Sequence, residues 1–138
     1  MTNAALPVQT ASQVNSRAMS AAGLRAFFNI AHDWKLNTDE QMTLLGKPGR
    51  STFFKWKSSP QTADLKHDTL ERLSYILGAY KALQVLLPDP RAADEWVKKP
   101  NTAPLFGGKS ALERMLGGNV ADLLMVRQYL DAQRGGWA

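Results

Sequence analysis

The sequence predicts an all-α protein in which a helix-turn-helix domain is followed by a small helical domain. Three observations support this fold class. Apolar residues recur at the three- and four-residue spacing of amphipathic helices, and capping residues stand at the start of several such stretches. No stretch of alternating apolar and polar residues is long enough to propose a strand. The chain of 138 residues, 44% of them hydrophobic, suffices for one domain or two small ones.

The first 19 residues predict a disordered arm, because they consist largely of Ala, Ser, Thr, Asn and Gln. They contain no unbroken apolar run, so we expect neither a signal peptide nor a membrane-spanning helix there. The first domain is predicted over residues 20–87. Its first helix is expected to begin at Ser20 as N-cap and to run to about Trp34.

Three more helices are predicted in this domain. A capping box over residues 38–41 starts a short helix that Gly46 ends. After a turn at 47–49, a second short helix is expected over residues 50–57. Another capping box, beginning at Asp68, heads the longest helix, whose apolar residues keep helical spacing up to residue 87.

The second domain is predicted over residues 88–138. Asp89 as a cap and Pro90 in the first turn predict a short helix over residues 92–98. The segment 101–108 that follows is rich in turn residues and has no periodic apolar pattern.

Two final helices complete the second domain. Ser110 and Glu113 have the spacing of a capping box, and the glycine pair 117–118 ends the short helix that this box heads. Asn119 starts the last helix, and a second glycine pair, 135–136, follows it. We expect the core between these two helices to contain four leucines: Leu112, Leu116, Leu123 and Leu130.

The segment from 38 to 57 has the parts of a helix-turn-helix. Phe53 and Trp56 would anchor its second helix in the core, with Phe54 on the outer face. The cations and hydroxyls near that face suit DNA phosphates, with the helix N-terminus entering the major groove. The predicted DNA-binding residues are Lys47, Arg50, Ser51, Thr52, Lys55 and Lys57. The alternatives are a solvated basic face on an ordinary helical hairpin, or a degenerate DNA reader that serves only as scaffold.

Composition favours an anionic partner and gives no sign of catalysis. The formal charge of +5 comes from 17 basic and 12 acidic residues. With no cysteine there is no disulfide framework and no thiolate, and a cytoplasmic location is expected. His32 and His67 lack metal-ligand spacing, and no nucleophile, base and orienting group are grouped together. We therefore expect no metal, no cofactor and no enzymatic activity.

Two motifs carry a family resemblance. Pro100-Asn101, then Gly107-Gly108-Lys109-Ser110-Ala111-Leu112-Glu113 and Leu116, resemble the toxin-binding domain of Xre/MbcA/ParS-type antitoxins. The family pattern reads roughly Pro-Asn…Leu-Gly-Gly-x-Ser/Thr-Pro-Leu-Glu-Leu-Leu. Here Ala111 stands where Pro is commoner, and Phe106 stands where Leu is common. The segment 44–56 is also similar to the Xre-type helix-turn-helix that precedes this domain in the family.

The resemblance implies the antitoxin of a type II toxin–antitoxin system that neutralises a RES-domain toxin and represses its own operon by binding operator DNA. RES-domain toxins consume NAD or transfer its ADP-ribose, and family members place their C-terminal end at the toxin's active-site entrance. Family members also tend to be dimers, so a homodimer is expected, and no membrane partner is implied.

The tail is the expected toxin-binding segment, although its sequence differs from the Tyr-Gly ending usual in the family. Its residues are Arg134, Gly135, Gly136, Trp137 and Ala138. An aromatic side chain buried in a cleft commonly dominates binding energy, and a terminal carboxylate suits an Arg that would otherwise hold a phosphate. The alternative is a dimeric helix-turn-helix transcriptional regulator without a toxin partner, which would have no need of Trp137 on a glycine tail.

Overall fold

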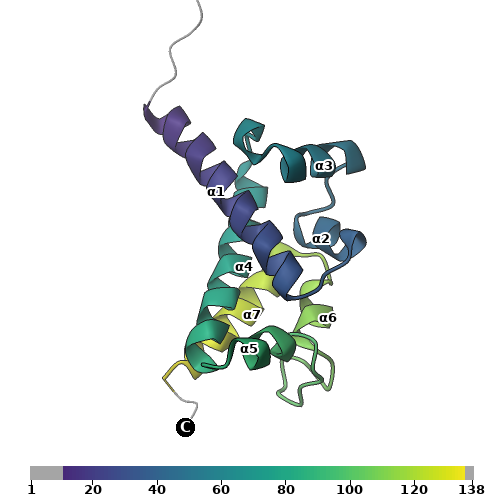
Figure 1. The fold of residues 1–138 in the computed structure, drawn as a ribbon. Helices are drawn as coiled ribbons and strands as arrows, with labels where there is room; N and C mark the ends of the chain where they lie inside the picture. The colour runs from purple at the N-terminus through teal and green to yellow at the C-terminus, as the bar shows by residue number, and fades with distance from the viewer. Residues whose placement is uncertain (1–10, 136–138) are drawn as a thin grey trace, which may run out of the picture.

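The computed structural model describes residues 11–135, with side chains from residue 16 onward. In this part of the chain every regular element is a helix, as predicted, and the one β-type contact is an isolated bridge between Pro100 and Ser110. The elements are α1 Ala11–Asp33, α2 Thr38–Leu44, α3 Arg50–Ser58, the 3-10 helix η1 Pro60–Thr62, α4 His67–Leu86, α5 Pro90–Trp96, α6 Ala111–Met115 and α7 Val120–Gln133 (Figure 1).

The helices pack around α4, which connects the two halves of the molecule. α1 crosses α4 and also covers η1, whereas α7 packs along α4 on the other side of the core (Figure 1). α3 lies at one end of the molecule, and α5 and the end of α7 lie at the other. The buried apolar side chains form one cluster that runs from Leu24 in α1 to Leu130 in α7.

The core of the C-terminal half differs from the prediction in its partners. Leu112, Leu123 and Leu130 are buried as expected, and Leu116 is half-buried. However, α7 makes its most extensive contact with α4, and its contact with α6 is smaller. The two C-terminal helices therefore do not enclose a core of their own, because the long helix of the first half supplies the main surface that α7 covers.

The predicted start of the first helix is wrong. α1 begins at Ala11, and Ser20 lies within it, fully buried, with its hydroxyl accepting a hydrogen bond from the backbone N–H of Leu65 at 3.5 Å. The prediction of a disordered arm is thus wrong for residues 11–19, and residues 1–10 lie outside the described part. The Ser20 hydroxyl thus bonds the segment before α4, and it does not cap the start of α1.

The cap of α2 lies one residue before the predicted one. The Asn37 side chain accepts from the Glu40 N–H at 2.7 Å, and the Glu40 carboxylate accepts from the Asn37 N–H at 2.9 Å. Asn is among the strongest N-cap residues, so Thr38 becomes the first helical residue instead of the cap.

The predicted capping box at Asp68 is absent. α4 begins at His67 after Lys66, which makes no side-chain capping bond. The Asp68 carboxylate instead accepts a hydrogen bond from Arg72 Nε at 3.0 Å. This i,i+4 ion pair directs the carboxylate along the helix and not toward the backbone N–H groups at its start.

Helix starts in the C-terminal half agree better with the sequence. Asp89 caps α5 by accepting from the Arg91 N–H at 3.1 Å, although α5 spans Pro90–Trp96 and not 92–98. Ser110 and Glu113 form the predicted box: the Ser110 hydroxyl accepts at 3.1 Å, and the Glu113 carboxylate accepts from the Ser110 N–H at 3.3 Å.

Candidate functional site

The turn between α2 and α3 reverses the chain through two adjacent left-handed residues. Gly46 and Lys47 have φ angles of 93° and 61°. The Lys47 N–H donates to the Met42 carbonyl at 2.8 Å, and the Gly46 N–H donates to the Thr43 carbonyl at 3.1 Å. This pair of bonds is a Schellman motif, which satisfies the last carbonyls of α2. The predicted helix-turn-helix is therefore present.

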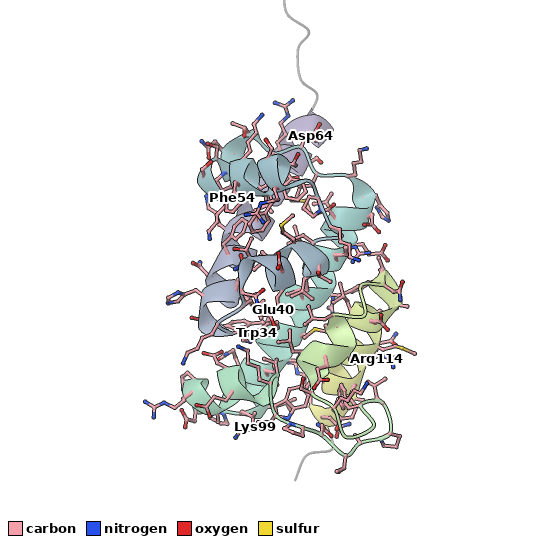
Figure 2. All side chains as sticks on the ribbon, turned by 90° about the vertical axis from the view of Figure 1, so that its right-hand side faces the viewer. Trp34, Glu40, Phe54, Asp64, Lys99 and Arg114 are labelled. Carbon is pink, nitrogen blue, oxygen red and sulfur yellow. The ribbon has the colours of Figure 1, made fainter. Side chains whose placement is uncertain are left out.

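One side of α3 is anchored in the core and the other faces outward. Phe53 is fully buried, and its ring meets the Phe28 ring of α1 edge-on, with centroids 5.7 Å apart. Trp56 is half-buried and packs against the same cluster. Phe54, the next residue along α3, is exposed, at the end of the molecule far from Lys99 (Figure 2).

All six predicted DNA-binding residues are exposed: Lys47, Arg50, Ser51, Thr52, Lys55 and Lys57. Within residues 16–135, every ion pair involves other side chains, so none of the four cations of this set is paired with a carboxylate. The Lys57 ammonium lies 5.9 Å from the centre of the Phe28 ring. Asp64 is exposed at the same end of the molecule (Figure 2) and pairs with none of them. The outer face of α3 is thus a concentrated positive surface.

The turn-rich segment before α6 is closed by hydrogen bonds around one asparagine. The Asn101 N–H donates to the Lys109 carbonyl at 3.0 Å, its carbonyl accepts from the Gly108 N–H at 2.8 Å, and its side chain accepts from the Ala103 N–H at 2.9 Å. Gly107 and Gly108 have φ angles of 59° and 90°, which lets the chain double back. The loop is therefore a folded unit.

Phe106 fixes this loop to the domain. Its ring is 4% exposed and packs edge-on against Tyr129 of α7, at 5.1 Å between centroids, and against Trp96 of α5, at 5.9 Å. The three aromatic rings therefore pack α5, the loop and α7 against one another. Phe106 fills the position where Leu is common in the family pattern.

The described part of the tail leaves the end of α7. Arg134 is the C-cap residue, exposed, with its N–H donating to the Asp131 carbonyl at 3.3 Å. Gly135 is also exposed, and a Cβ there would meet no atom within 4 Å. The other three predicted toxin-binding residues, Gly136, Trp137 and Ala138, lie outside the described residues.

Arg72 is a residue that sequence reasoning missed. Its guanidinium is almost fully buried and bridges the two halves, because it bonds Asp68 of its own helix and donates through Nη2 to the Gly118 carbonyl at 3.0 Å. The Asp68–Arg72 spacing alone indicates only a surface ion pair, so nothing in the sequence signals this second bond.

The remaining chemistry of the described residues offers no second site. His32 and His67 are exposed, and no three His, Cys, Asp or Glu side chains between residues 16 and 135 gather as a metal site would require. Among the described helices, none is long and apolar enough to cross a membrane.

Comparison with known proteins decides the family. The model of the antitoxin Xre-like helix-turn-helix domain matches residues 13–78, and that of the antitoxin Xre/MbcA/ParS C-terminal toxin-binding domain matches residues 82–136. The chain belongs to the Xre/MbcA/ParS antitoxins. The two matches meet inside α4, so this antitoxin joins its domains through one continuous helix.

One relative matches nearly the whole length of the chain. The antitoxin is 52% identical over 130 residues to "Uncharacterized protein y4oB" of Sinorhizobium fredii (strain NBRC 101917 / NGR234), a match that covers 94% of this chain and 98% of that protein. The shared length therefore includes most of both matched domains.

Proposed function

We propose that this antitoxin neutralises a RES-domain toxin by placing its C-terminal end in the toxin's active site, and that it represses its own operon as a DNA-bound homodimer. The observation that carries the proposal is the pairing of an Xre-like helix-turn-helix with a toxin-binding domain on one core. The RES toxin rests on the resemblance described above. The cytoplasm, where operator DNA is found, is the proposed location.

Exposed cations support the DNA-binding part of the proposal. Arg50, Lys55 and the neighbouring Ser51 are exposed on α3, and no acidic residue lies in the first turn of this helix. A helix N-terminus carries partial positive charge and favours phosphate. The expected role of these side chains is to hold phosphates while α3 enters the major groove.

The test is a double variant, Arg50→Ala with Lys55→Ala, measured on a duplex that covers the region upstream of the antitoxin's own gene. Each lost phosphate contact should reduce the slope of log affinity against log salt by about one unit, and affinity should fall. A double variant at Lys81 and Arg91, exposed cations of α4 and α5, removes the same charge and should keep the wild-type slope. Equal affinity and slope for the α3 variant and the wild type would disprove this assignment.

The position of the end of α7 supports the toxin-binding part of the proposal. α7 ends at the end of the molecule away from α3 (Figure 1), so a toxin held there would leave the positive face open to DNA. Trp137 is an aromatic residue after two glycines, and an anchor of this kind contributes about 2 kcal/mol or more when it fills a cleft.

Co-expression with the toxin encoded beside the antitoxin gene tests the tail. An antitoxin that lacks residues 135–138 should bind the upstream duplex normally but fail to restore growth and cellular NAD. The α3 double variant is the reciprocal control, because it should protect cells fully. Rescue by the truncated chain would move inhibition away from the tail, to the surface over residues 107–116.

A further inference from the structure

Phe54 is a large apolar side chain exposed at the centre of the positive face. It is 43% exposed, although it belongs to the same helix as the fully buried Phe53. The outward residues of α3 follow helical spacing on either side of it: Arg50 and Ser51 one turn before, Lys55 and Ser58 beside and after it. The fold covers only part of this ring, so a partner that covered the exposed part would gain the burial of apolar surface.

The ring is held in place by contacts on two sides. The Phe53 ring meets it edge-on at 5.1 Å, and Phe53 is in turn packed on Phe28, so aromatic contacts extend from the core to the surface. On the other side, the Arg50 guanidinium lies over the Phe54 ring, 5.4 Å from its centre. These contacts limit the rotamers of Phe54 before binding, which lowers the entropy that a partner must overcome.

The charge around the ring identifies the kind of partner. Lys47, Arg50, Lys55 and Lys57 are exposed cations without a carboxylate partner among the described residues. The complementary surface is therefore polyanionic and must also offer an apolar group at its centre. The DNA major groove meets both needs, since phosphates line its edges and thymine presents a C5-methyl group on its floor.

We propose that Phe54 reads thymine in the operator, its ring covering one or more C5-methyl groups while the surrounding cations hold phosphates. This inference rests on the proposed entry of α3 into the major groove. It assigns Phe54 to sequence discrimination, whereas Arg50 both contacts phosphate and orients the ring.

The experiment compares two duplexes of the upstream region that differ only in thymine content, one made with thymidine and one with deoxyuridine. Wild-type antitoxin should bind the uracil duplex less tightly, by about fourfold for each methyl group covered. Phe54→Ala should bind both duplexes alike, at the weaker affinity, with an unchanged salt slope because its phosphate contacts remain. Phe54→Leu should recover part of the discrimination.

Val85→Ala is the matched control, because Val85 is 53% exposed and belongs to the last turn of α4, which leads into α5 at the other end of the molecule from α3 (Figure 1). It should discriminate between the duplexes as the wild type does. If the wild type binds both duplexes with equal affinity and a normal salt slope, Phe54 does not recognise thymine, although DNA binding by α3 still stands. Discrimination that persists in Phe54→Ala would also overturn the reading of thymine, by tracing the uracil effect to DNA shape.

Two other results would overturn the inference in a different way. If neither duplex binds with a salt-dependent affinity, the proposed DNA-binding function fails and the reading of thymine fails with it. If Phe54→Ala instead dissociates a homodimer or the toxin complex in analytical ultracentrifugation while keeping its DNA affinity, the ring belongs to a protein interface. Circular dichroism melts of each variant establish that the fold is intact.

Discussion

Gly46 and Lys47, in the turn that orients α3, both have positive φ angles. At Gly46 this conformation has no steric cost, whereas a side chain there would adopt a conformation that costs about 1–2 kcal/mol. A Cβ at this position would also stand 3.1 Å from Arg72 Nε. The turn is therefore tied sterically to the buried arginine that joins the two halves.

Gly46→Ala should reduce the free energy of unfolding by about 1–2 kcal/mol in denaturant titrations. Gly49→Ala is the control in the same turn: its φ is −60° and a Cβ there meets nothing within 4 Å, so its effect should stay within about 0.5 kcal/mol. Equal losses in the two variants would show that the left-handed conformation of Gly46 is not what limits this position.

Asp33 and Asp94 bring two carboxylates to the junction of α1, α4 and α5. Asp33 accepts from the Tyr80 hydroxyl at 2.8 Å, and Asp94 accepts from Gln84 Nε2 at 3.2 Å. Burial raises the pKa of Asp94, and the charge of Asp33 raises it further, against the opposing effect of the Gln84 hydrogen bond. Burial together with the Asp33 hydrogen bond raises the pKa of Tyr80 to about 12.

Asp94→Asn should stabilise the fold slightly at pH 7. The folded-state pKa of Asp94 is above its unfolded value. The protonated carboxyl therefore contributes fully to the free energy of unfolding below about pH 4, and this contribution is lost as pH rises through the folded-state pKa. The gain should be under about 1 kcal/mol, since solvent screens this half-exposed group. In thermal melts the variant and the wild type should converge at low pH. A variant that is less stable at pH 7 would show instead that the carboxylate is stabilising.

At the scale of elements, the contact between α4 and α7 holds the toxin-binding half in place. Leu123 is 1% exposed within it, and Arg127 of α7 donates to the Ser74 carbonyl of α4 at 3.2 Å. Gly78 lies against the Arg127 side chain: a Cβ there would come within 2.5 Å of Arg127 Nε, so the small residue leaves room for the guanidinium to cross α4. The interface is thus apolar at its centre and bridged by arginine at its edge.

Leu123→Ala should cost about 2–5 kcal/mol of unfolding free energy in the full chain, as other large-to-small core substitutions do. Met125→Ala is the control on the same helix, because Met125 is 42% exposed, and it should change stability by less than about 0.5 kcal/mol. A melting midpoint unchanged by Leu123→Ala would contradict the burial of this side chain.

Local signals in the sequence identified the elements whose boundaries are set locally. Gly46, the Ser110 box and Asp89 with Pro90 each act through bonds or conformations within a few residues, so their patterns could be read directly. The same is true of the outer face of α3, because the burial of Phe53 fixes which side of a short helix is exposed.

Features set by tertiary contacts were missed or misplaced. Ser20 resembles a cap, yet its hydroxyl bonds Leu65 far along the chain. The bond from Arg72 to the Gly118 carbonyl joins residues 46 positions apart, and no periodicity reports such a contact. The packing of α7 on α4 could not be predicted for the same reason. An amphipathic stripe predicts that one side of a helix is buried, but it does not indicate which other helix covers that side.

At the scale of the whole molecule, the two antitoxin domains share one core. α4 packs against α1 on one side and α7 on the other, and Arg72 bonds the C-terminal half from within it. The chain should therefore unfold in one cooperative step. Tryptophan fluorescence and far-ultraviolet circular dichroism should give coincident denaturant transitions, and the calorimetric and van't Hoff enthalpies should agree. Two separated transitions would mean that the halves fold independently.

We propose that this antitoxin blocks the active site of an NAD-consuming toxin. The direct measurement is the rate at which the purified toxin encoded beside it consumes NAD while the antitoxin is added in steps. We expect the rate to fall to zero at a stoichiometric amount of full-length chain, and the chain lacking residues 135–138 to leave the rate nearly unchanged. A toxin that consumes NAD at its full rate in the presence of excess full-length antitoxin would contradict this mode of inhibition.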